Sequence, residues 1–355
     1  MTSLLDPVRL GDLTLPNRIA LSPPPHARCG ADGVPGAASA ADHAQCATAG
    51  LVIADAASVS RNAVADELAP GLYGQAQVQG WRRVAAAVHA AGGTVFAPLC
   101  HSGRVSSYAL LEGRAPLAPS AVDDDLHLLR VYARLANGCH GRIAASPARA
   151  MTIAEIHCAV EEFRAAARNA LRAGLDGVEI HAGDGYLPQQ FLSPHTNRRA
   201  DLFGGQLVDR VRFLDLVLRA VLEEVPAGRV GVRISPFSTR NNAPDPDAVA
   251  TYTYLARVLG VAGVAYLHAT DCDERGGMPE MQRLLAIVRP HFCGVVIAGC
   301  GTDRAAGAAL LASGQADMVA LGRHRLDGAA PDEGDRLSHP REPAHLALAS
   351  DRSII

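Results

Sequence analysis

The sequence has no strong net charge, no apolar run of membrane length and no secretion signal. Its 355 residues carry a formal charge of -3, so no field attracts nucleic acid or an anionic membrane. The start of the chain lacks a basic end followed by an apolar run, and no stretch approaches the roughly 20 apolar residues that span a bilayer. We therefore expect a cytoplasmic protein that binds a small molecule, not nucleic acid or a membrane. A homo-oligomer is left open.

Paired cysteines and aromatic residues are also scarce. The eight cysteines form no CxxC pair and no repeated metal-ligand spacing, which favours reduced thiols and indicates no metal site. Aromatic residues make up 4% of the chain, with Trp81 as its one tryptophan. We therefore expect a binding site that depends little on stacking.

Apolar residues are abundant instead, at 48%, and their pattern predicts a closed barrel. Eight short apolar runs occur at residues 18–22, 51–54, 94–99, 177–180, 230–234, 263–267, 294–298 and 317–321. Amphipathic segments typical of helices occur at residues 78–90, 153–173, 207–224, 248–258 and 303–312. This alternation predicts an α/β fold, a single (β/α)8 TIM-barrel domain over residues 1–355. A doubly wound open sheet shows the same alternation, but the Gly-rich dinucleotide fingerprint after the first strand is missing.

Two segments lie outside this alternation. Residues 8–15 alternate in polarity around Gly11 and Asp12, which predicts an N-terminal β-hairpin that plugs the bottom of the barrel. A long insertion follows the third strand, from about residue 100 to residue 150, and is rich in Pro, Gly, Asp and Arg. Because loops at that end of a barrel build the active site, we predict that the insertion is an active-site lid. A surface excursion without a chemical role is the alternative.

The fourth apolar run leads into the most informative loop of the chain. Its strand ends at His181, and the polar loop that follows carries Asp184 and Tyr186. A (β/α)8 enzyme keeps its chemistry where the barrel strands end, and these three side chains all handle protons. The sequence therefore predicts a catalytic site at His181, Asp184 and Tyr186.

The same loop continues as Gln189-Gln-Phe-Leu-Ser-Pro194 and then as Asn197-Arg-Arg-Ala-Asp201-Leu-Phe-Gly204-Gly205. With these motifs the chain resembles the old yellow enzyme family, flavin-dependent reductases of activated alkenes built on a (β/α)8 barrel. The resemblance begins near Leu5 and fades after Arg323. It implies bound FMN, NAD(P)H as the reductant and an enone-like metabolite as the substrate.

The resemblance also implies a role for several residues. In the family, His181 and the residue three positions later hold the substrate carbonyl, and Tyr186 protonates the α-carbon after hydride reaches the β-carbon. A phenol is protonated at neutral pH and can act as this acid. Arg233 matches the arginine beside the isoalloxazine ring, and an arginine in an apolar strand requires a buried anionic partner. The FMN phosphate is expected at the ends of the seventh and eighth strands, at Cys300, Gly301, Gly322 and Arg323.

Several positions depart from the family pattern. Asp184 replaces a hydrogen-bond donor, and an ionised carboxylate repels the charge that develops on an enolate oxygen. Asp184 could be protonated, could pair with a cationic His181, could act as a general base or could turn away to cap a backbone amide. The remaining predicted contacts of the flavin are Pro23, Pro25, Ala57 and Pro98. Pro25 and Pro98 replace side chains that hydrogen-bond the ring, which predicts weakened FMN binding.

These departures leave more than one function open. The first is NAD(P)H-driven, FMN-dependent reduction of an activated alkene, which we favour because Arg233, Gly322 and Arg323 match both ends of an anionic cofactor. The alternative is a barrel with weak or absent flavin, in which His181, Asp184 and Tyr186 carry out redox-neutral isomerisation or cyclisation in biosynthesis. A catalytically inactive binding protein fits less well, because the histidine, the tyrosine and the arginine are all present.

Overall fold

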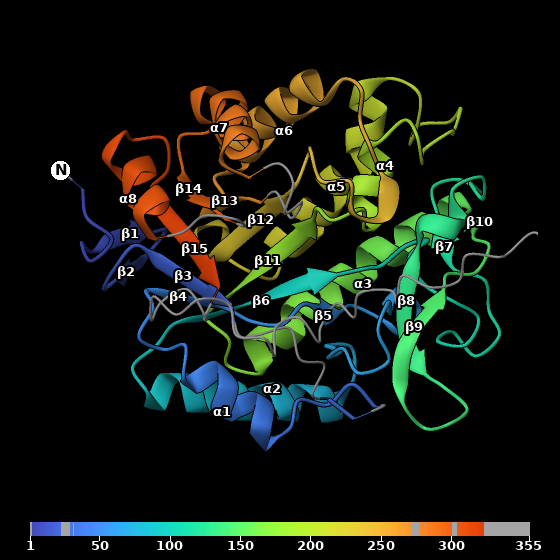
Figure 1. Ribbon diagram of the computed structural model, residues 1–355, viewed down its shortest axis with the longest axis horizontal. Helices are drawn as coiled ribbons and strands as arrows, with labels where there is room; N and C mark the ends of the chain where they lie inside the picture. The colour runs from blue at the N-terminus through green and yellow to red at the C-terminus, as the bar shows by residue number, and fades with distance from the viewer. Residues whose placement is uncertain (1, 23–28, 31, 271–276, 300–303, 323–355) are drawn as a thin grey trace, which may run out of the picture.

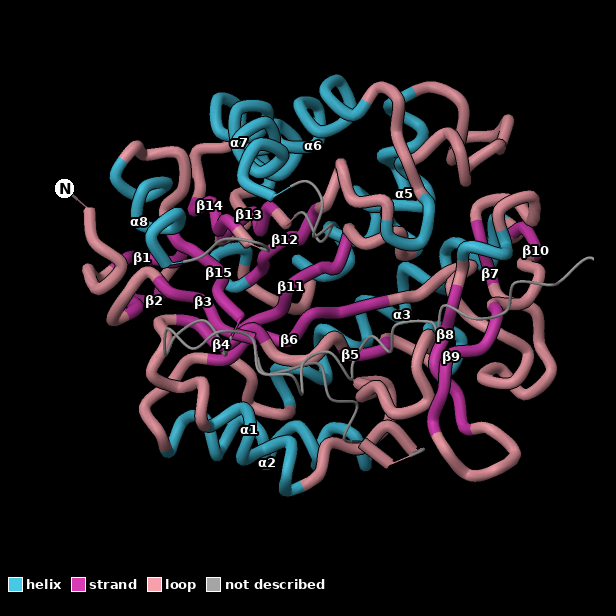
Figure 2. The backbone as a smooth tube through the Cα atoms, viewed as in Figure 1, coloured by secondary structure: helices cyan, strands magenta, loops and turns pink. Residues whose placement is uncertain are grey.

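Eight parallel strands form a closed barrel in the computed structural model, which describes residues 2–22, 29–30, 32–270, 277–299 and 304–322. The barrel strands are β3 (Ile19–Ser22), β4 (Leu51–Ile53), β6 (Val95–Cys100), β11 (Gly177–Ala182), β12 (Val230–Ile234), β13 (Tyr266–Ala269), β14 (Val295–Ala298) and β15 (Met318–Gly322). Their order is β11-β12-β13-β14-β15-β3-β4-β6, and β6 pairs back with β11 (Figures 1 and 2). Each strand overlaps one of the eight predicted apolar runs, so the predicted (β/α)8 barrel is confirmed.

One strand boundary was predicted three residues too early. The apolar run that begins at Gly263 contains the strand β13, but that strand begins at Tyr266. Gly263 has a φ of 69° and forms the C-terminal cap of the preceding helix. A glycine in the left-handed region ends a helix, so the first residues of the run belong to a helix end rather than to a strand.

Helices cover the outside of the barrel (Figures 1 and 2). They are α1 (Ala37–Ala44), α2 (Gln75–Ala90), α3 (Ile153–Arg172), α4 (Leu187–Leu192), α5 (Leu207–Leu222), α6 (Ala248–Ala262), α7 (Gly277–Val288) and α8 (Arg304–Ala312). The start of α3 shows why the local sequence folds in this way. Thr152 and Glu155 form a reciprocal capping box there, which satisfies two backbone N–H groups that have no partner within the helix. The apolar faces of the helices pack against the outward side chains of the strands.

Side chains along each strand alternate between this outer layer and the barrel interior. On β6, Val95 and Ala97 pack outward, whereas Phe96 lies in the inner cluster with Tyr266 of β13. The N-terminal hairpin, β1 (Val8–Leu10) paired antiparallel with β2 (Leu13–Leu15), contributes three buried side chains to that inner cluster. The hairpin therefore plugs the amino end of the barrel, as predicted.

The insertion after β6 lies at the opposite end of the barrel from the hairpin (Figure 1). It forms the antiparallel pair β8 (Arg130–Arg134) and β9 (His140–Ala144) and the parallel pair β7 (Leu117–Ala118) and β10 (Arg149–Ala150). It also has a small apolar core of its own, built around Val105, Leu129 and Val131. The insertion is thus an ordered layer at the carboxyl ends of the strands.

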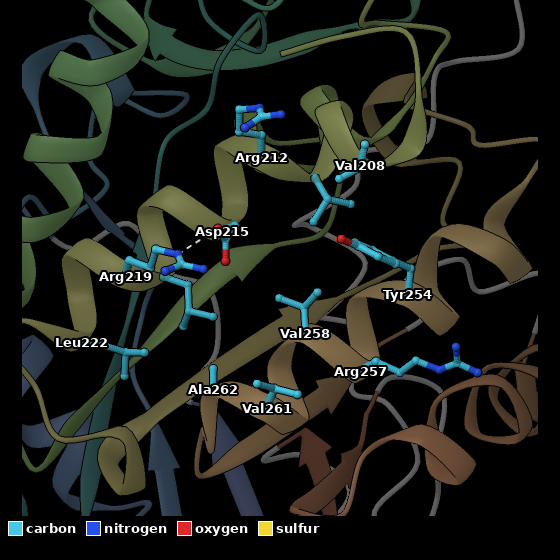
Figure 3. Close-up of a pocket in the computed structure, with 12 residues that line it drawn as sticks. Val208, Arg212, Asp215, Arg219, Leu222, Tyr254, Arg257, Val258, Val261 and Ala262 are labelled. Carbon is cyan, nitrogen blue, oxygen red and sulfur yellow. Dashed lines mark hydrogen bonds and ion pairs between the residues drawn. The ribbon is translucent and has the colours of Figure 1, made fainter. Parts of the chain in front are cut away.

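A separate groove of about 560 Å³ lies between α5 and α6 on the outside of the barrel (Figure 3). Val208, Val258 and Val261 line it together with Tyr254 and Arg257. Its position away from the strand ends separates it from the predicted catalytic residues. Among the residues that the structure describes, no helix is both long enough and apolar enough for a bilayer crossing.

Candidate active site

The structure brings the three predicted catalytic residues together with Arg233 at the carboxyl ends of two neighbouring strands. His181 is the fifth residue of β11, and it lies opposite Arg233 of β12 in the parallel register. Asp184 and Tyr186 belong to the loop between β11 and α4. Side chains of residues aligned in adjacent strands point to the same face, so the histidine and the arginine both face the barrel interior.

Asp184 joins these two side chains. Its Oδ2 atom lies 2.9 Å from Arg233 Nη2 and 3.3 Å from His181 Nε2. The side chains of Asp184 and His181 are buried, at 4% and 3% exposed, whereas Arg233 retains 19% exposure. The arginine in an apolar strand thus has the buried anionic partner that its sequence context required.

Polar residues that the sequence did not single out hold the Asp184 loop in place. Asp184 has a φ of 55°, a left-handed conformation that few residues other than glycine adopt without support. Its N–H donates to Ser235 Oγ at 2.6 Å, and its carbonyl accepts from Asn241 Nδ2 at 2.7 Å. The next amide, that of Gly185, donates to Gln189 Oε1 at 2.9 Å. The sequence signal for these positions was weak, since only Gln189 lies within the recognised motif.

The charge states follow from these contacts. Burial alone would raise the pKa of Asp184, but the Arg233 charge and the His181 hydrogen bond outweigh it and hold that pKa well below 3.8. Burial and the Arg233 charge lower the pKa of His181, against the pull of Asp184. At neutral pH the site therefore contains an ionised Asp184 and a neutral His181. The Asp184 carboxylate faces Arg233 and His181 instead of capping an amide, and these contacts favour an ionised Asp184 beside a neutral His181 over the other protonation states.

The neutral His181 has a defined tautomer. Its Nδ1 atom accepts from the Gly183 N–H at 3.3 Å, so the ring proton lies on Nε2 and is directed at Asp184 Oδ2. The position of the ring proton is inferred from these two contacts of the ring nitrogens. In this arrangement the one N–H donor of His181 is already used by a neighbouring side chain.

Tyr186 stands beside this pair. Its ring meets the His181 ring edge to face, with centroids 5.0 Å apart, and it packs against the small apolar core of the insertion. Burial raises the pKa of Tyr186, with Cys100 and Asp184 adding to the effect against nearby arginines. The hydroxyl is therefore protonated at neutral pH, as a proton donor must be.

The predicted FMN contacts fall into two groups. Pro23, Pro25, Cys300, Gly301 and Arg323 lie outside the described residues. Ala57 lies in β5 (Ala57–Ser58), which pairs with β6, and Pro98 lies within β6 itself. Gly322 ends β15.

The described residues fit an FMN molecule at both of its ends. The partly exposed Arg233 supplies a cation for the electron-rich edge of the ring. On the phosphate side, β14 is followed by Gly299, its neighbour β15 ends at Gly322, and α8 begins at Arg304. Glycine backbone and a helix start at adjacent strand ends suit a phosphate.

A second polar cluster lies where the insertion meets the loop after α4. The ligand atoms of Asp124, Asp125 and His195 lie within 4.8 Å of one another. Asp125 Oδ2 already accepts hydrogen bonds from Arg104, from His195 at 3.2 Å and from Asn242 at 2.6 Å. These protein donors account for the cluster as a structural junction between the insertion and two neighbouring loops.

The strand ends of this (β/α)8 barrel carry a protonated tyrosine, a histidine and a carboxylate–arginine pair. Such groups beside a site for an anionic cofactor are typical of a barrel enzyme that uses acid–base chemistry. The model of the NADH:flavin oxidoreductase / NADH oxidase family matches residues 3–341. The chain therefore belongs to this family, the old yellow enzymes.

Individual relatives agree with this assignment. The 12-oxophytodienoate reductase 1 of Oryza sativa subsp. japonica is 38% identical over 328 residues, which cover 90% of this chain and 82% of the rice protein. A structure of morphinone reductase in complex with tetrahydroNAD is 37% identical with a TM-score of 0.85, over 95% of this chain and 91% of that one. The old yellow enzyme homologue from Zymomonas mobilis is 32% identical with a TM-score of 0.84, over 95% and 92% of the two chains.

The predicted activity follows from the family. The chain is an FMN-dependent oxidoreductase of the old yellow enzyme type that uses NAD(P)H to reduce an activated alkene in a small molecule. The redox-neutral alternative is not favoured. The model of the flavin oxidoreductase family matches residues 3–341, which include the whole barrel.

Proposed function

We propose that Tyr186 supplies the proton in this alkene reduction, while His181, Asp184 and Arg233 position the reactants. The carrying observation is the contact of Tyr186 with His181 on one side and with the apolar core of the insertion on the other. A protonated hydroxyl between the polar group of the site and the apolar core of the insertion can donate its proton to a carbon atom of a substrate bound beside it.

Bound FMN supplies the hydride that NAD(P)H delivers. The protein residues then have separate tasks. The Tyr186 hydroxyl donates its proton to the carbon next to the one that receives the hydride, and solvent returns a proton to the phenolate. Arg233, fixed by Asp184, contributes positive charge at the edge of the barrel interior. The apolar core of the insertion shields one side of the tyrosine from water.

We also propose which residues hold the cofactor. Arg233 contacts the ring, Ala57 and Pro98 form part of its apolar surroundings, and the backbone of Gly322 contacts the phosphate. The sequence predicts Pro23, Pro25, Cys300, Gly301 and Arg323 as further contacts. Since proline side chains donate no hydrogen bond, we expect FMN to bind more weakly than it would with donors at those positions.

The insertion is proposed to act as the active-site lid of one domain that spans residues 1–355. Its junction at Asp125 and its contact with Tyr186 support this role. We further propose a cytoplasmic location, which the free thiols of Cys29, Cys46, Cys100, Cys139, Cys158 and Cys293 support. The homo-oligomer stays a prediction.

Two half-reactions test the proposed function. Protein loaded with FMN is mixed without oxygen with NADPH or NADH, and bleaching of the flavin absorbance reports its reduction. Maleimide, an activated alkene, is then added, and we expect the absorbance to return as the alkene is reduced. A protein that binds no FMN, or a reduced flavin that the alkene does not reoxidise, would contradict the proposal.

A further inference from the structure

The two oxygen atoms of the Asp184 carboxylate have different surroundings. Oδ2 accepts from both Arg233 and His181. Oδ1 is buried and accepts no hydrogen bond from any residue in the described part of the chain. One oxygen is therefore saturated by the protein, and the other has no donor.

Such an atom needs an explanation. A buried carboxylate oxygen without a donor loses its hydration without compensation, and buried polar atoms in folded proteins nearly always have a partner. Three neighbouring donors bind other atoms. The His181 proton is on Oδ2, and the loop amides of Asp184 and Gly185 donate to Ser235 and Gln189.

The carboxylate with the unpaired oxygen and the proposed proton donor have His181 as a common neighbour. Asp184 Oδ2 lies 3.3 Å from His181 Nε2, and the His181 ring contacts the Tyr186 ring with centroids 5.0 Å apart. Tyr186 in turn contacts His181 and the insertion. A substrate whose carbon atom lies beside Tyr186 therefore has its polar group close to Asp184.

A substrate group that only accepts hydrogen bonds does not match this site. The one N–H of His181 is directed at Asp184, and an ionised carboxylate repels the lone pairs of a carbonyl oxygen. A group that donates a hydrogen bond satisfies Oδ1 and gains a charge-assisted interaction.

We propose that the substrate is an activated alkene that also carries an N–H or O–H donor, neutral or cationic, and that this donor binds Asp184 Oδ1. Asp184 is then the residue that determines specificity. The proposal rests on the proposed function, since it concerns the substrate of the same site. Unsaturated imides, lactams and protonated amines belong to this class, whereas a simple cyclic enone does not.

Two ligands that differ only at the donor test this proposal. Succinimide presents an N–H between two carbonyls, and N-methylsuccinimide replaces that hydrogen with a methyl group. Neither has an alkene, so binding is measured without turnover, by isothermal titration calorimetry on the oxidised, FMN-loaded protein at pH 7. We expect succinimide to bind at least about tenfold more tightly, as a hydrogen bond to a charged group does.

Variants separate the hydrogen bond from a steric effect of the methyl group. Asp184→Asn keeps the size of the side chain but removes its charge, and we expect the two imides to bind within about threefold of each other. Asp12→Asn is the matched control, because it removes one carboxylate at the exposed turn of the N-terminal hairpin, and it should keep the preference of the parent. Retention of the full preference in Asp184→Asn would show exclusion of the methyl group and overturn the proposal.

The outcome for this proposal can be told apart from that for the proposed function. If the loaded protein reduces maleimide but binds both succinimides equally, the reductase assignment stands and the donor proposal fails. If the protein reduces neither maleimide nor N-methylmaleimide, the proposed function itself fails. Should Asp184→Asn not fold, the comparison of the two imides in the parent still decides the donor proposal.

Discussion

At the scale of single residues, the structure supports Tyr186 as the proton donor. Burial raises the pKa of its hydroxyl, and its ring packs against that of His181. We expect Tyr186→Phe to reduce turnover by roughly 10²–10⁴-fold, because the alkene then lacks its proton donor. FMN affinity and the reduction of the flavin by NAD(P)H should remain near those of the parent. Stopped-flow measurement of both half-reactions checks this, and an unchanged rate of flavin reoxidation by the alkene would rule out the role.

Arg233 and Asp184 depend on each other. Arg233→Ala leaves a buried carboxylate without its cation, which costs about 3–5 kcal/mol of unfolding free energy, and it removes a proposed contact of the FMN ring. In an Asp184→Asn background the same change should cost about 1–3 kcal/mol less. Urea unfolding of the four proteins in this double-mutant cycle measures the coupling. Additive effects would show that the pair at 2.9 Å contributes nothing to stability.

The sequence identified both Arg233 and Asp184 as unusual residues, but it did not predict that they form an ion pair with each other. Arg233 required a buried anion, and Asp184 stood where a donor was expected. Residues 49 positions apart become neighbours only through the register that aligns His181 with Arg233. A register is set by the packing of whole strands, and the motifs of a single segment do not contain it.

At the scale of elements, one carboxylate of the insertion, that of Asp125, joins it to two neighbouring loops. Asp125 accepts from Arg104 within the insertion, from His195 after α4 and from Asn242 after β12. Burial alone would raise the pKa of Asp125, but hydrogen bonds from Arg104 and Asn242 lower it. The Asp125 carboxylate is therefore ionised at neutral pH.

We expect Asp125→Ala to loosen the insertion without disrupting the barrel. Arg104, 1% exposed, would keep a buried charge without its partner. Hydrogen–deuterium exchange of residues 123–146 should rise, and the KM for the alkene should increase more than the dissociation constant of FMN. Asp124→Ala is the control, because the Asp124–Arg198 pair is exposed on both sides and contributes little. Equal hydrogen–deuterium exchange in the two variants would contradict the role of Asp125 in holding the insertion in place.

Element boundaries show where sequence patterns stop being sufficient. The amphipathic pattern predicted a helix from residue 153, which is the residue where α3 begins, after the capping box of Thr152 and Glu155. In contrast, the short helices α1 and α4 were not predicted, because neither is long enough to display a full amphipathic period. The small strands of the insertion are equally short, and they depend on contacts between distant residues.

At the scale of the whole molecule, a polar network crosses the barrel interior. Glu179 of β11 accepts from Tyr266 Oη at 3.0 Å and from His268 Nδ1 at 2.9 Å, both on β13. The intervening strand β12 offers Gly231 at the same level. A Cβ atom there would lie 2.1 Å from the Tyr266 ring, so the glycine makes room for the tyrosine to reach across one strand. The network thus connects strands that are not hydrogen-bonded neighbours.

This network makes barrel stability depend on pH. Burial alone would raise the pKa of Glu179, but the charge and hydrogen bond of His268 outweigh it and lower the pKa below its ordinary value of 4.5. A group with a lowered pKa in the folded state binds fewer protons there than in the unfolded state. Its contribution is therefore complete above about pH 4.5 and is lost as the pH falls through the folded-state pKa.

We expect Glu179→Gln to be less stable than the parent by about 1–3 kcal/mol at pH 7, because the buried partners keep a neutral acceptor but lose the charge. The difference should shrink as the pH is lowered from 6 to 4, since only the parent has this carboxylate to protonate. Urea unfolding of both proteins, saturated with FMN and followed by circular dichroism, measures the difference at each pH. Asp12→Asn again controls for a lost exposed carboxylate. A difference between Glu179→Gln and the parent that stays constant over this range would mean that Glu179 is not charged inside the barrel.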